Sequence, residues 1–122
     1  MTARGSSSSI AAHHGAAQQA IRDGDLRQAQ EHCLAILAID PDFADAWFLC
    51  GVIAADNGAV VKAADIFRKA IVLAPDKAEY HAELGKQLIA LREPRDALSA
   101  ATTALSLSPT ALPILNTLAT VF

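Results

Sequence analysis

A fixed period of 34 residues is the feature that most constrains how this chain can fold. Pro41, Pro75 and Pro109 are spaced by this interval along the sequence. Other small residues repeat at the same interval: Ala29, Ala63 and Ala97; Ala17, Gly51, Gly85 and Ala119; Gly24 and Gly58. Independent series that share one period in one register indicate a chain built from structural repeats, each of which needs its neighbours to cover its apolar face.

Each repeat is predicted to contain two helices. In the second repeat the apolar residues follow i, i+3, i+4, i+7 spacing from Trp47 to Ala54 and again from Ala63 to Ile71, which gives one apolar stripe per helix. Asp56-Asn57-Gly58 separates the stripes and is typical of a turn, because glycine tolerates positive φ. The pattern predicts helices over residues 10–22, 26–39, 43–56, 60–73, 77–91, 94–107 and 110–121.

Length and charge exclude several classes of protein. The chain has 122 residues, enough for one ordinary domain, and ten basic against thirteen acidic residues give a net charge of −3. This balance does not favour nucleic acid or an anionic membrane as a partner. Residues 1–9 hold no apolar core of a signal peptide and are predicted to be a disordered, Ser-rich tail, and no segment reads as a membrane span. We therefore expect a cytoplasmic protein.

The repeat resembles the tetratricopeptide repeat (TPR) family, whose pattern is W-x₂-L-G-x₂-Y, then A-x₃-F, then P. The second repeat reads Trp47-x₂-Cys50-Gly51-x₂-Ala54, then Ala63-x₃-Phe67, then Pro75. The third reads His81-x₂-Leu84-Gly85-x₂-Leu88, then Ala97-x₃-Ala101, then Pro109. The first repeat is weaker and has Ala16 and Ala20 at two of the large positions.

This resemblance implies an all-α fold, a right-handed superhelix (α-α solenoid) of antiparallel helix pairs with about 3.5 TPR units. The repeats would cover about residues 10–43, 44–77 and 78–111, with a partial repeat at 112–122. Gly51 and Gly85 would let paired helices approach closely, while Trp47 and Phe67 would fill the space between neighbouring units.

The residues that could carry chemistry form no recognisable catalytic or metal-binding motif. The four histidines are His13, His14, His32 and His81, and they lack HExxH or zinc spacing. His81 stands where Trp47 stands one repeat earlier, so a packing role is predicted. Cys33 and Cys50 lie in apolar stretches and are expected to be buried, reduced thiols. The sequence thus predicts no catalytic residue, metal or cofactor, and a chain that is not an enzyme.

In the TPR family the concave face is the usual binding surface. Transferring its positions to this sequence gives His14, Gln18, Asp45, Phe48, Leu49, Val52, Glu79, Glu83, Lys86 and Ile89. The apolar residues Phe48, Leu49 and Val52 are either part of a groove or covered by another segment. We favour the groove, because exposed apolar patches mark interaction sites.

The charges of this predicted groove indicate a partner. Asp45, Glu79 and Glu83 would favour a protein or peptide with Lys or Arg. Glu79 and Glu83 stand where some family members place cations that grip the C-terminal carboxylate of heat-shock chaperones, which argues against that ligand.

The main prediction is therefore a protein-binding scaffold. An alternative is the N-terminal recognition arm of a larger enzyme, such as a sulfotransferase or a glycosyltransferase, and another is a structural spacer. Residues 97–122 carry no charge, so we also expect self-association through the C-terminal helix.

Overall fold

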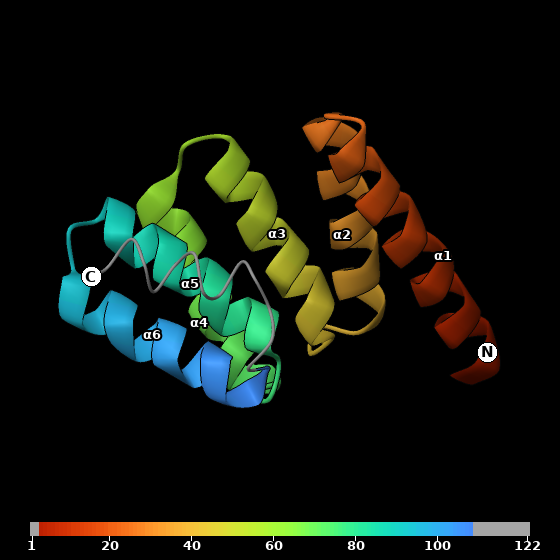
Figure 1. The fold of residues 1–122 in the computed structure, drawn as a ribbon. Helices are drawn as coiled ribbons and strands as arrows, with labels where there is room; N and C mark the ends of the chain where they lie inside the picture. Colours follow the sequence, from red (N-terminus) through yellow and green to blue (C-terminus); the bar gives the residue numbers. More distant parts are fainter. Residues whose placement is uncertain (1–2, 109–122) are drawn as a thin grey trace.

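The computed structural model describes residues 3–108, which form six α-helices and no strand. Successive helices run antiparallel as pairs (Figure 1). The helices are α1 (Ala3–Arg22), α2 (Leu26–Ile39), α3 (Ala44–Asp56), α4 (Val60–Leu73), α5 (Ala78–Ala90) and α6 (Pro94–Leu107). The predicted all-α repeat architecture is confirmed for this part of the chain. The predicted seventh helix over 110–121 lies outside the described residues.

The helix boundaries follow the turn residues. The second helix of each pair, α2, α4 and α6, begins and ends where the sequence predicts. Gly24 and Gly58 turn the chain between paired helices with φ of 79° and 80°. The side chain of Asp25 accepts a hydrogen bond from the Gln28 backbone N–H and caps α2, while Pro94 occupies the first turn of α6. These local signals are readable without tertiary information.

The first helix is longer than predicted. Helix α1 begins at Ala3, inside the segment 1–9 that the sequence analysis assigned to a disordered tail. No proline interrupts residues 3–9, and a helix that has already formed gains one backbone hydrogen bond for each residue added, which here outweighs the poor helix propensity of Gly5. Serine is only a moderately poor helix former, so the Ser-rich composition does not stop the helix.

The helices form an inner and an outer layer. The first helices of the pairs are in contact, α1 with α3 and α3 with α5, whereas the described outer helices α2, α4 and α6 contact inner helices only. Because inner helices lie closer together than outer ones, the inner layer is the concave side of the stack.

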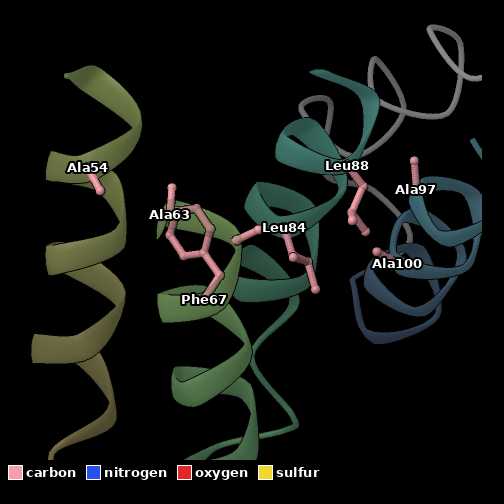
Figure 2. Close-up of a cluster of buried hydrophobic side chains, with 8 residues drawn as sticks. Ala54, Ala63, Phe67, Leu84, Leu88, Ala97 and Ala100 are labelled. Atoms are coloured by element: carbon pink, nitrogen blue, oxygen red, sulfur yellow. The ribbon is translucent and has the colours of Figure 1, made fainter. Parts of the chain in front are cut away.

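Phe67 anchors the largest core cluster. Its side chain, from α4, is fully buried and packs with Ala54 of α3 and Leu84 of α5 in a cluster that reaches α6 (Figure 2). A Cβ added at Gly51 would lie only 2.5 Å from the Phe67 ring. The predicted close approach at Gly51 and the packing role of Phe67 are therefore confirmed. Aromatic burial of this size is a large part of what holds α3 against α4.

Candidate functional site

The predicted groove residues all lie on the inner helices α1, α3 and α5, but they differ in exposure. Glu79 and Lys86 are exposed and Leu49 is buried. The others are partly exposed: His14, Gln18, Asp45, Phe48, Val52, Glu83 and Ile89. The inner layer thus presents a mixed polar and apolar surface, and Leu49 is not part of that surface.

Leu49 was wrongly expected to be a groove anchor. It is 6% exposed and packs in a cluster with Ala17 and Ala20 of α1 and Cys33 of α2. The small residues of α1 leave a space between the first and second repeats, and the Leu49 side chain fills it. Its neighbour Phe48 is only partly buried and points to the boundary with the third repeat. Leu49 is therefore a core residue.

Asp45 joins the three inner helices. One carboxylate oxygen pairs with Nε2 of His14 on α1, and the other accepts a hydrogen bond of 2.9 Å from the Tyr80 hydroxyl on α5. The His14 and Asp45 side chains keep about a quarter of their surface in solvent, at 27% and 25%. Sequence reasoning expected Asp45 to attract a cationic ligand, but both of its oxygens already hold neighbouring repeats together.

Tyr80 is the residue of this surface that sequence reasoning missed. It is 1% exposed, and its ring stacks on Phe48 with centroids 4.6 Å apart and an angle of 20°. Burial, and then the neighbouring Asp45 carboxylate, raise the pKa of its hydroxyl. Tyr80 takes the place that Ala46 holds one repeat earlier, and a buried tyrosine needs a partner for its O–H. The presence of the chain's single tyrosine in an inner helix was the sequence signal that could have predicted this hydrogen bond.

Charge on α5 is concentrated near its start. Glu79 is exposed and belongs to none of the ion pairs found within residues 3–108. Glu83 is partly exposed and pairs with Lys86 across 3.0 Å, which offsets its charge. The acidic character predicted for this end of the groove therefore comes first from Glu79 and second from Glu83.

Two hollows lie on the other side of the inner helices. One, of about 250 Å³, is lined by α2, α3 and α4 and includes Trp47, Cys50 and Lys62. The other, of about 500 Å³, is lined by α4, α5 and α6. Neither is lined by a predicted groove residue. The predicted groove therefore does not coincide with either of these two hollows.

The remaining chemical groups form no catalytic arrangement in the described chain. His13 Nδ1 lies 2.9 Å from His32 Nδ1, as expected when one imidazole donates to the other. Cys33 and Cys50 are free thiols. No three potential metal ligands converge within residues 3–108, and none of the described helices has the length and apolarity to span a bilayer.

These features define a class of protein, an α-helical solenoid whose repeats are joined by a shared inner surface. Residues 14–78 match the sequence profile of the Tetratricopeptide repeat family. The match covers more than half of the chain, and the chain belongs to this family.

Solved structures agree with this assignment. The chain is similar to a mutant of the O-GlcNAc transferase of Thermobaculum terrenum, with 30% identity and a TM-score of 0.93, over 99% of this chain and 23% of the transferase. The first TPR domain of human RPAP3 superposes with a TM-score of 0.85 at 14% identity, covering 92% of this chain and 88% of that domain. The first TPR of Spaghetti (RPAP3), solved with the HSP90 peptide SRMEEVD, superposes with a TM-score of 0.86 at 14% identity. The match covers 93% of this chain and 90% of that one. No curated protein sequence matches the chain.

Proposed function

We propose that the concave face binds an extended segment of another protein. The observation that carries this proposal is the inner surface itself, where the neighbouring helices α3 and α5 carry the partly exposed Phe48, Val52 and Ile89 together with the acidic Glu79 and Glu83. Partly exposed apolar side chains next to charges are typical of peptide-recognition surfaces.

The surface is held in shape before any ligand arrives. The Asp45 carboxylate links α1, α3 and α5, and the Phe48 ring is fixed against Tyr80. A preorganised surface loses less conformational entropy on binding, so more of the contact energy appears as affinity. This supports binding by the described repeats without large rearrangement.

The expected ligand is a basic segment with apolar residues. Glu79 and Glu83 would attract Lys or Arg and repel carboxylates. The Spaghetti domain was solved with an acidic HSP90 peptide, and this chain shares only 14% identity with it. We therefore propose a ligand of opposite charge.

A peptide-display selection tests this proposal. We expect the chain to enrich peptides that combine Lys or Arg with apolar residues. The double variant Glu79→Lys/Glu83→Lys should bind them at least about tenfold more weakly, because it replaces attraction of the basic peptide by repulsion. A tenfold change corresponds to about 1.4 kcal/mol of binding free energy.

The matched control is Glu31→Lys/Asp65→Lys, which makes the same change in net charge on the outer helices α2 and α4. It should bind within about twofold of the original chain. Equal losses in both double variants would reject the groove as the binding site, and selection of acidic peptides would reject the proposed ligand class.

A second candidate function is a recognition arm of a glycosyltransferase. The likeness to the Thermobaculum transferase favours it, because 30% identity extends over 99% of this chain while covering only 23% of that enzyme. In that case the groove would present a polypeptide substrate to a catalytic domain. Reading the gene beyond the codon for Phe122 tests this: an in-frame transferase domain would support it, and a nearby stop codon would reject it.

A further inference from the structure

A hollow on the outer side of the stack lies where two outer helices separate. Helices α2 and α4 both contact the inner helix α3 but not each other. Because the outer layer of a curved stack is wider than the inner one, a gap remains between α2 and α4. This gap, the outer hollow, has a volume of about 250 Å³ and is lined by α2, α3 and α4. None of the predicted groove residues lines it, so it is separate from the inner surface.

The wall of the outer hollow is mainly apolar. Helix α2 supplies Leu34 and Leu37, α3 supplies Trp47 and Ile53, and α4 supplies Ile66. Leu34 is 54% exposed, so part of this apolar wall is in contact with water. Covering such surface favours the binding of an apolar ligand. Since a cavity of about 150 Å³ holds benzene in another protein, the outer hollow has room for an aromatic ring with a short substituent.

The Trp47 ring is a fixed part of this wall. Its indole N–H donates to the carbonyl oxygen of Pro41 across 2.8 Å, and Nζ of Lys69 lies 5.7 Å from the ring centroid. These two contacts restrain the ring before a ligand arrives. A restrained wall loses less conformational entropy on binding than a mobile one.

The charge at the outer hollow is positive. Lys62 is exposed, lines the hollow and forms none of the ion pairs found within residues 3–108. Lys69 lies two turns further along α4, beside Trp47. In the described chain no acidic side chain lines this hollow. A free ammonium next to an apolar wall complements a ligand that has an apolar body and an anionic end.

The second hollow, of about 500 Å³, is the same feature one repeat later. His81 takes the place of Trp47 and Asp96 takes the place of Lys62, each 34 residues further along the chain. Asp96 and Arg68 both line this hollow, so it lacks the net positive charge of the outer hollow. The repeat therefore produces the hollow, and the side chains of each repeat set its charge. We expect an anionic ligand to select the outer hollow.

We propose that the outer hollow binds a small apolar carboxylate of the size of a substituted benzoate. The ring of the ligand lies against Trp47 and Ile66, and its carboxylate pairs with the ammonium group of Lys62. Contact between two aromatic rings stabilises the complex beyond the burial of apolar area. The ligand contacts α2 of the first repeat together with α3 and α4 of the second. It therefore stabilises the boundary between these repeats and raises the thermal midpoint of unfolding.

Fluorescence of Trp47, the single tryptophan of the chain, tests the proposal with 4-bromobenzoate. The bromine atom quenches indole emission on contact, so we expect saturable quenching of the folded chain. The neutral analogue 4-bromobenzamide has nearly the same size and lacks the charge. It should bind at least about threefold more weakly, because it cannot form the ion pair with Lys62. Quenching that rises linearly with concentration, or equal affinity for both compounds, would overturn the proposal.

Two variants locate the site. Lys62→Glu should bind 4-bromobenzoate at least about tenfold more weakly, because attraction of the carboxylate becomes repulsion. The matched control is Lys77→Glu, which makes the same change in charge at an exposed residue beyond the other end of α4. It should bind within about twofold of the original chain. Both lysines are exposed, and circular dichroism checks that each variant keeps its helicity. Equal losses in the two variants would place the ligand elsewhere and reject the outer hollow as its site.

Discussion

Trp47 and His81 occupy equivalent places in consecutive repeats and make the same hydrogen bond. The indole N–H of Trp47 donates to the carbonyl oxygen of Pro41 across 2.8 Å. Nε2 of His81 lies 2.8 Å from the carbonyl oxygen of Pro75. Because a carbonyl only accepts, Nε2 of His81 must carry the proton. The histidine therefore replaces the tryptophan through its ring N–H, beyond the packing role that the sequence predicted.

Replacing either ring by phenylalanine tests this equivalence. Trp47→Phe and His81→Phe both keep an aromatic side chain and remove the donor. Each is expected to lower the free energy of unfolding by about 0.5–1.5 kcal/mol, the usual net value of one hydrogen bond. Urea denaturation followed by circular dichroism measures the change. An unchanged midpoint in both variants would show that water replaces the bond without cost.

Gly51→Ala should destabilise the fold. Its new Cβ would lie 2.5 Å from the Phe67 ring, which is fully buried. We expect a loss of about 1–3 kcal/mol from overpacking. Gly15→Ala is the matched control, because nothing lies within 4 Å of a Cβ at that helical glycine. That control should be neutral or slightly stabilising, since alanine is the better helix former. Equal effects at both sites would contradict the close approach.

Arg92→Gly should stabilise the third repeat. Arg92 has a φ of 60° and stands at the place where Gly24 and Gly58 turn the first and second repeats. A side chain in the left-handed region costs about 1–2 kcal/mol, and its removal should recover about 1 kcal/mol after the greater entropy of glycine in the unfolded chain. Gly58→Ala should change stability in the opposite direction. Thermal and urea unfolding of the two variants measure whether each substitution raises or lowers the free energy of unfolding.

Tyr80→Phe should weaken the link between α3 and α5. It removes the donor to Asp45 and leaves the ring stack with Phe48, so we expect a loss of about 1–2 kcal/mol at pH 7.

The pH dependence of the same variant gives a second measurement. The pKa of Tyr80 is raised in the folded state, so the unfolded chain loses this proton first as pH rises through about 10. The stabilising contribution is complete below that pH and declines above it. The difference between the original chain and Tyr80→Phe should therefore narrow above about pH 10. A constant difference would contradict the raised pKa.

The local pattern was sufficient to predict the turns and most helix bounds within residues 3–108. Helices α2, α4 and α6 have the predicted bounds because glycine and proline mark the turns and the apolar stripes repeat at helical spacing. Gly51 and Phe67 were predicted to pack because they match the small and the large aromatic positions of the TPR pattern. The start of α1 was not predictable, because a Ser-rich segment without a stop signal is compatible with either helix or coil.

The sequence by itself determined the repeat, the turns and which residues share a stripe. Tertiary structure decided what covers each stripe. Leu49 is buried because Ala17 and Ala20, far away in the sequence, leave room for it. Asp45 holds the repeats together because His14 and Tyr80 reach it from two other helices. Such pairings depend on the sizes and directions of side chains on separate helices, which no periodicity along one chain specifies.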